Sequence, residues 1–240
     1  MLKKIVFLFF VVILFVPPSQ AQIYMGVHSG MSGTTIHLIE DGTLNHRRYY
    51  ADPYALTYGM NAKYRMANGR FGFGFRFDMV ESNGDVNYSS YNKVDTYTGS
   101  ELTYKRHIGQ IVIPHEFIIN KNKHDRYNLS LNLGPYWAWR IKSRSYGIEY
   151  RTIAILNDEG VYVFPREEWE VDRSSRGKIA DGYLGLSGGI DFDFHCFSNV
   201  YLTTSINFRQ DFRRQGYYNR HFLGTIGLFY RFDFEGKENS

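Results

Sequence analysis

The chain has 240 residues, and its 28 lysines and arginines against 24 aspartates and glutamates give a formal net charge of only +4. The basic residues are scattered and form no stripe, which argues against a nucleic-acid partner. The single cysteine, Cys196, cannot form an internal disulfide, and nothing in the composition points to a cofactor, so we expect none.

The first 21 residues have the layout of a secretory signal peptide. Lys3 and Lys4 precede an apolar run over residues 5–16, two prolines follow, and small residues lead to Ala21. An uncleaved anchor is the alternative, but the run is shorter than the roughly 20 residues that a spanning helix needs. We predict a cleaved signal peptide over 1–21, a β-barrel domain over 22–234 and a short tail over 235–240.

The mature chain is dominated by segments in which apolar and polar residues alternate, as on a strand with one apolar face. The clearest is FGFGFRFDMV at 71–80, where phenylalanines alternate with glycines, Arg76 and Asp78. In chain order, the alternating segments lie at 23–30, 54–66, 71–80, 102–119, 127–142, 182–194, 200–212 and 221–234. They predict eight strands.

Two of these strands carry signs of local irregularity. The apolar phase of 102–119 changes near Gly109 and Gln110, which predicts a β-bulge there. Pro135 falls on the apolar phase of 127–142 and lacks a backbone donor, which predicts a bulge or a broken ladder at that point.

The connections alternate in length. They are short near 67–70, 120–126 and 195–199, long and polar near 31–53, 81–101 and 143–180, and intermediate near 212–219. Short turns at one end, long loops at the other and an even strand count are typical of an outer-membrane barrel. We therefore predict an all-β fold, an eight-stranded antiparallel up-and-down transmembrane β-barrel with short periplasmic turns and long extracellular loops. Within 143–180, YRTIAIL and GVYVFP predict a hairpin that turns at 157–160.

In such a barrel the apolar phase faces lipid and the polar phase fills the lumen, which is narrow enough for side chains to close. The predicted inward charges carry both signs and can pair across the interior, so we expect a filled lumen and no diffusion pore. The predicted lumen charge network consists of Lys63, Arg65, Arg76, Asp78, Arg140, Asp191, Asp193, Arg209, Arg231 and Asp233.

Several segments resemble the PorT-like outer-membrane β-barrel proteins of Bacteroidota. The similar stretches are YMGVHSG at 24–30, IVIPHEF at 111–117, LGPYWAW at 133–139, LGLSGGIDF at 184–192 and LGTIGLFYRF at 223–232. The resemblance implies an eight-stranded outer-membrane barrel and, for most members, no assigned biochemical activity. The long segment 143–180 departs from the family pattern.

Histidines near predicted strand tops raise the alternative of a barrel hydrolase or acyltransferase acting on lipid A. The candidates are His28 beside Ser29, His107 and His221. Such an enzyme needs a base within hydrogen-bond reach of a hydroxyl and a carboxylate to orient the base. Neighbouring residues on a strand point to opposite faces, so His28 and Ser29 do not form that pair unaided.

Metal binding has weaker support. The histidines at 46, 107, 115 and 124 lack the close spacing of metal ligands, and we expect no metal site. NDEG at 157–160 and the pair Glu167 and Glu168 miss the spaced ligands of a calcium loop and are expected to be solvated charges. Interfacial aromatic residues, with sugar or peptide stacking as the alternative use, are expected at Tyr49, Tyr50, Tyr54, Trp137, Trp139, Tyr217 and Tyr218.

Three functions remain open on the sequence. The first is an outer-membrane barrel with a structural or interaction role, in contact with outer-membrane lipid and lipopolysaccharide, and with an extracellular or envelope protein partner at the loops 31–53, 81–101 and 143–180. Its aromatic last strand, YRFDF at 230–234, is similar to those read by the outer-membrane insertion machinery. The second is the lipid-A-modifying enzyme. The third is a soluble periplasmic lipocalin-like barrel, in which the apolar phase would line a ligand cavity.

Overall fold

The computed structural model describes residues 21–38, 46–51, 55–66, 70–92, 96–121, 126–178, 182–212 and 217–233. The first 20 residues of the predicted signal peptide and the predicted tail lie outside these ranges. Every element of the described part is a strand. The ring is built from β1 (Ala21–Leu38), β3 (Ala55–Met66), β4 (Phe71–Asn92), β5 (Thr96–Val112), β6 (His115–Lys121), β7 (Tyr127–Ile153), β11 (Tyr183–Phe197), β12 (Val200–Asp211) and β13 (Tyr217–Asp233).

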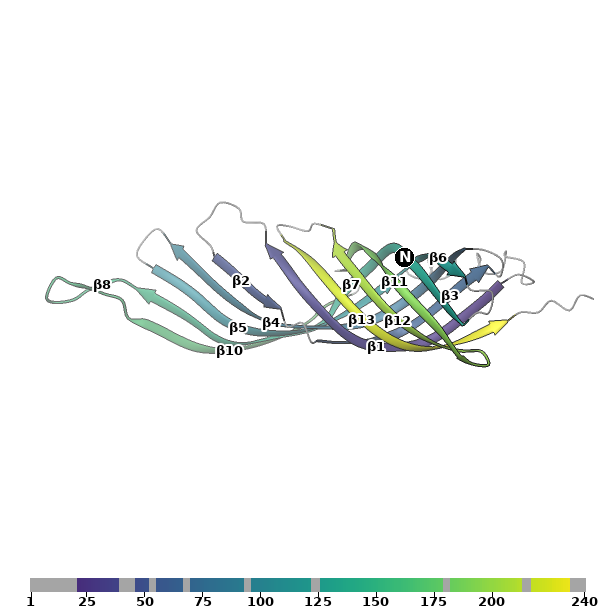
Figure 1. Cartoon of the computed structure of the whole chain (residues 1–240). Coiled ribbons are helices and arrows are strands. Elements are labelled where there is room, and N and C mark those ends of the chain that lie inside the picture. The colour runs from purple at the N-terminus through teal and green to yellow at the C-terminus, as the bar shows by residue number, and fades with distance from the viewer. Residues whose placement is uncertain are drawn as a thin grey trace, which may run out of the picture.

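The strands close into a ring in which each strand pairs antiparallel with its neighbours. β1 pairs with β3 on one side and with β13 on the other, so the first and last strands complete the circle. β5 and β6 both pair with β4 and β7, and they follow one another along a single wall. Because β5 and β6 together act as one barrel strand, the ring has eight strands. The predicted eight-stranded antiparallel up-and-down barrel is confirmed (Figure 1).

The two faces of the wall have opposite chemistry. On β4, Phe71 is 65% exposed, whereas Arg76 and Asp78 are buried. The same alternation holds around the ring. Exposed apolar side chains on the outer face include Val27, Met60, Leu133, Ile190, Ile206, Phe222, Ile226 and Leu228.

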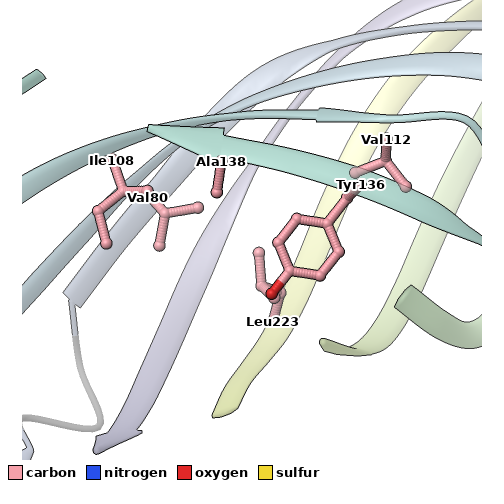
Figure 2. Packing of buried hydrophobic residues seen from close by; sticks show 6 residues of the cluster. All are labelled: Val80, Ile108, Val112, Tyr136, Ala138 and Leu223. Carbon is pink, nitrogen blue, oxygen red and sulfur yellow. The ribbon is translucent and has the colours of Figure 1, made fainter. Parts of the chain in front are cut away.

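The interior also contains an apolar cluster. Val80, Ile108, Val112, Tyr136, Ala138 and Leu223 form one buried cluster, and Figure 2 shows Tyr136 and Leu223 reaching toward each other inside the barrel. These residues come from β4, β5, β7 and β13, so the cluster spans the lumen.

Three strands of the ring continue beyond it as a sheet that we call the extension, seen on the left of Figure 1. β4, β5 and β7 form its centre, and β2 (His46–Ala51) and β10 (Arg166–Arg176) pair with its two edges. A separate hairpin of β8 (Ile155–Leu156) and β9 (Tyr162–Val163) ends it. The described parts of the predicted long loops 81–101 and 143–180 are therefore mostly strand, and the predicted hairpin turning at 157–160 is present.

The predicted bulge at Gly109 and Gln110 is wrong. Ile108, Gln110 and Val112 all face inward, with no change of phase. The apolar pattern shifts because the outer face is polar on the extension and apolar on the barrel. The bulge lies in the partner strand, where His107 pairs with Lys142 and Ile108 with Arg140, leaving Ile141 as the extra residue.

Pro135 itself remains in the ladder, opposite Leu186 of β11. On its other side the neighbouring wall is interrupted, because β5 ends at Val112 and β6 begins at His115. The break in the sheet beside Pro135 is thus in the neighbouring strand, between β5 and β6.

Candidate functional site

Charged side chains fill the lumen near the short connections. Lys63 Nζ lies 2.8 Å from Asp191 Oδ2, 3.6 Å from Asp193 Oδ1 and 3.5 Å from Glu116 Oε1. Arg65 Nε donates to Glu116 Oε2 at 2.6 Å, and its Nη2 donates to both Glu116 and Asp193. We call these five residues the turn-side cluster; all are buried, so every charge has an opposite partner within the barrel.

A second cluster surrounds Asp78 at the middle of the barrel. Arg76 Nε donates to both Asp78 oxygens at 2.9 Å, Arg209 Nη2 donates to Asp78 Oδ2 at 2.5 Å, and His28 Nε2 donates to Asp78 Oδ1 at 2.5 Å. Arg209 also donates to Gln110 and, at 3.3 Å, to Ser187. We call Arg76, Asp78, His28, Arg209 and Gln110 the central cluster.

A small cavity with room for about one water molecule lies between the two clusters. Asp191 lines it on one side, and Arg76 and Arg209 line it on the other. Asn61 Oδ1 and Asn207 Nδ2 are buried and have no hydrogen-bond partner among the described residues. A water molecule in this cavity would satisfy such groups and join the two clusters.

The ten predicted lumen residues have four different outcomes. Seven are buried in the two clusters: Lys63, Arg65, Arg76, Asp78, Asp191, Asp193 and Arg209. Arg231 is half-buried and donates from Nη1 to the Tyr201 hydroxyl at 2.5 Å. Arg140 lies opposite the inward-facing Ile108, at the bulge where β7 leaves the ring, and its side chain is exposed and belongs to neither cluster. Asp233 pairs with Gln22 in register, but its side chain is outside the described set.

The sequence reasoning missed Glu116, which binds both cations of the turn-side cluster, and Gln110. Glu116 faces inward opposite Phe117, so the alternation around Phe117 was the signal that could have found it.

The candidate catalytic histidines do not form a nucleophile, base and orienting carboxylate in reach of solvent. His28 binds Asp78 inside the barrel, and Ser29 is exposed on the other face. His107 Nδ1 lies 3.6 Å from Glu81 Oε1 on the outer face.

His221 comes nearest to a catalytic arrangement. Its Nδ1 lies 2.9 Å from Thr34 Oγ1, and its Nε2 lies 3.8 Å from Asp211 Oδ1, which also accepts a hydrogen bond from Tyr136. All four residues are at most 5% exposed, so a substrate has no access to this hydroxyl in the structure.

Among the described residues, no group of three or more His, Cys, Asp or Glu side chains is placed to hold a metal ion. His124 and Tyr54 lie outside those residues, as do the side chains of His46, Tyr49, Tyr50, Tyr217 and Tyr218. In NDEG, Asn157 Oδ1 accepts hydrogen bonds from the amides of Glu159 and Val161, which is a turn-forming role. Trp137 and Trp139 are half-buried on the outer face; a Cβ added at Gly109 would lie 2.6 Å from the Trp139 ring.

The hairpin at the end of the extension exposes large apolar side chains. We call residues 155–164 the tip. Ile155 pairs with Val163 and Leu156 with Tyr162, so both faces of this two-stranded ribbon are apolar. Its apolar side chains are between 41% and 64% exposed: Ile155, Leu156, Val161, Tyr162, Val163 and Phe164. From Lys142 at the ring to the tip is about 45 Å along β7.

The described residues contain no helix long and apolar enough to cross a membrane. No protein-family model and no curated protein matches the chain.

Solved structures match it weakly over most of its length. The crystal structure of Ail, the attachment invasion locus protein of Yersinia pestis, is 16% identical with a TM-score of 0.36, over 90% of this chain and 100% of that chain. The outer membrane protein OprG from Pseudomonas aeruginosa is 10% identical with a TM-score of 0.42, over 90% and 97%. Neisserial surface protein A is 11% identical with a TM-score of 0.37, over 88% and 97%. Likeness at this level carries no function across.

Proposed function

We propose that the protein is a bacterial outer-membrane β-barrel whose lumen is filled by side chains and which binds another molecule through the tip. The observation that carries this proposal is the inversion of the two faces. Charged residues are buried inside the barrel, while phenylalanines, leucines and methionines are exposed outside. A soluble lipocalin-like barrel needs the opposite arrangement, because its outer face meets water.

The outer apolar face is suited in height to a bilayer. On β4 the outward residues from Phe71 to Met79 carry no charge, and on β13 the same holds from Phe222 to Phe232. Eight residue steps at a strand tilt near 40° correspond to about 20 Å along the barrel axis, close to the roughly 25 Å apolar band of outer-membrane barrels. A closed ring also leaves no backbone edge in the hydrocarbon.

The interior supports a binding role in preference to transport or catalysis. Two ion-paired clusters and an apolar cluster fill the lumen. The candidate histidines are engaged within this packing or on the outer wall. We therefore infer that the protein is no enzyme and that it binds its partner outside the ring.

The tip is the proposed working surface, and its partner is proposed to be an extracellular or envelope protein. Burying six apolar side chains in a bilayer would gain about 3 kcal/mol on the insertion scale. The turn that leads the insertion carries Asp158 and Glu159, which together would cost about 6 kcal/mol in hydrocarbon. The cost of burying the two carboxylates exceeds the gain from the apolar side chains, so insertion of the tip into a bilayer is unfavourable. A protein cleft that covers both faces of the ribbon and leaves the turn in water fits better.

We also propose that the signal peptide over 1–21 is cleaved, that the outer-membrane insertion machinery assembles the barrel, and that the chain is one of the PorT-like barrels of Bacteroidota.

Labelling of single cysteines tests the location and the orientation together. Cys196 is exposed at the short connection 195–199, and Asp158 lies at the opposite end. The full chain and the variant D158C in a C196S background are expressed, and intact cells are treated with a membrane-impermeant maleimide. We expect only D158C to be labelled on intact cells, and Cys196 only after the outer membrane is opened. Labelling of Cys196 on intact cells would overturn the proposed orientation.

Site-specific photo-cross-linking tests the working surface. A photoreactive residue at Tyr162 or Phe164 is expected to give a discrete protein adduct on cells. The same residue at Glu170, exposed on the polar stem of the hairpin, is the matched control. Equal adducts at all three positions, or none at the tip, would refute a binding role for the tip.

A further inference from the structure

The outer face of the extension has an unusual group of cations where the wall leaves the ring. Lys105 of β5 lies directly opposite Arg144 of β7, and Lys142 of β7 lies directly opposite Arg176 of β10. All four side chains are exposed. Like charges in directly opposite positions of a sheet are destabilising, so two such pairs side by side call for an anion between them.

The position of this group follows from the bulge. Trp139 faces outward on the barrel, and without an extra residue the strand would turn Lys142 and Arg144 inward. Ile141 is that extra residue, so Lys142 joins His107 and Arg144 joins Lys105 on the outer face. The first cationic row lies two residues beyond Gly109, the partner of Trp139, which is about 7 Å further along the strand.

The local acidic residues do not cancel the positive charge. Asp172 accepts from Arg144 at 2.9 Å, and hydrogen bonds from Arg144 hold the pKa of Asp172 below its usual range. Glu81 faces His107 at 3.6 Å. Asp85 of β4 lies on the same face and accepts a hydrogen bond from Thr103. Lys105, Lys142 and Arg176 have no ion pair among the described residues, so the face keeps a net excess of about one positive charge.

We propose that Lys105, Lys142, Arg144 and Arg176 form a binding site for the phosphate groups of lipopolysaccharide in the surrounding outer leaflet. Aromatic residues of a membrane barrel lie at the headgroup level, and the cations lie directly beyond Trp139. The site rests on the proposed outer-membrane location. It would bind the barrel to its lipid and fix how far the extension stands above the surface.

The test uses the mature full chain, residues 22–240, in detergent micelles. Purified lipopolysaccharide is titrated, and binding is followed by tryptophan fluorescence, because Trp139 lies on the outer face just before the cations. The variant is K105Q/K142Q. The matched control is R70Q/R126Q, which removes the same charge from exposed positions at the other end of the barrel.

We expect K105Q/K142Q to bind about 30-fold more weakly, from about 1 kcal/mol for each cation and 1.4 kcal/mol for each tenfold change. We expect R70Q/R126Q to bind as the wild type does, and dephosphorylated lipid A to bind poorly to all three. Equal weakening in both variants, or unchanged binding in K105Q/K142Q, would overturn the site. Competition by millimolar inorganic phosphate alone would overturn the lipid as its ligand.

Two controls separate this site from the proposed function. A change of gel mobility on boiling shows that each variant forms the barrel; if K105Q/K142Q lost it, R176Q at the end of the edge strand would replace it, with an expected loss of about 5-fold. A wild-type chain that fractionated as a soluble periplasmic protein would overturn the membrane location. A membrane-resident wild type without phosphate-dependent binding would overturn the site alone.

Discussion

Asp78 should matter more to stability than Arg209, although both are fully buried partners in one ion pair. Arg76 and Arg209 both donate to Asp78. Replacing Asp78 by Asn therefore leaves two guanidinium groups facing each other without a carboxylate. Removing one side of a buried pair costs about 3–5 kcal/mol, and D78N falls at the upper end of that range because it strands two charges.

Replacing Arg209 by Met has a different consequence, because Arg76 and Asp78 then balance each other. The losses are the hydrogen bonds to Ser187 and Gln110, whose buried groups are left without a donor. An unsatisfied buried polar group costs about 1–3 kcal/mol, and we expect R209M to cost about 2 kcal/mol in total.

Equilibrium unfolding by urea in lipid vesicles measures both values. Tryptophan fluorescence reports the transition, and gel mobility before and after boiling reports the folded fraction independently. The expected order is wild type, then R209M, then D78N, with at least about 1 kcal/mol between the two variants. A D78N barrel as stable as R209M would refute the charge balance inferred for the central cluster.

Four further outcomes are expected. Gly227→Ala would bring a Cβ to 2.7 Å from the His28 Cβ and 2.6 Å from a backbone oxygen, so we expect it to destabilise the barrel by about 1–3 kcal/mol in the same unfolding assay. Because the lumen is filled, reconstituted protein should give no conductance above background in planar bilayers; discrete channels would contradict this. Single Ala substitution of each candidate histidine should leave the lipid A mass spectrum unchanged, and an altered profile would revive the enzyme hypothesis. D172N should strengthen lipopolysaccharide binding about 5-fold by releasing Arg144, and weaker binding would count against the cationic site.

Much of the barrel could be predicted from the sequence, because one rule governs most of its strands. Where one face meets an apolar environment and the other a polar one, alternation identifies the face. Asp191 and Asp193 alternate with Phe192 and Phe194, and the structure buries the aspartates and exposes the phenylalanines. The pairing partners of each charge were not predictable, because alternation gives the face of a residue and no distance across the lumen.

The remaining errors arise where that rule changes along a strand. At Tyr104 and Ile108 the interior is apolar and the outer face of the extension is polar, so the pattern inverts without any bulge. The true bulge at Ile141 is masked, because the strand passes from an apolar outer face to a cationic one at the same residue. Arg140 keeps the inward phase, but it lies where β7 leaves the ring and is exposed, because alternation along a strand does not show where the lumen ends.

The structure separates what holds the barrel from what it presents. The ring closes through pairs that lie below the extension, and its charged interior lies within that ring, so no contact of the tip contributes to closure. The edge strand β10 carries charges along most of its length, which protects the extension from pairing with other sheets. Apolar exposure is greatest at the tip, where the six side chains are 41–64% exposed, against 37–44% for Tyr146, Ile148 and Trp169 on the stem. Apolar exposure in the one part of the extension that the fold does not need is best explained by a partner that covers it.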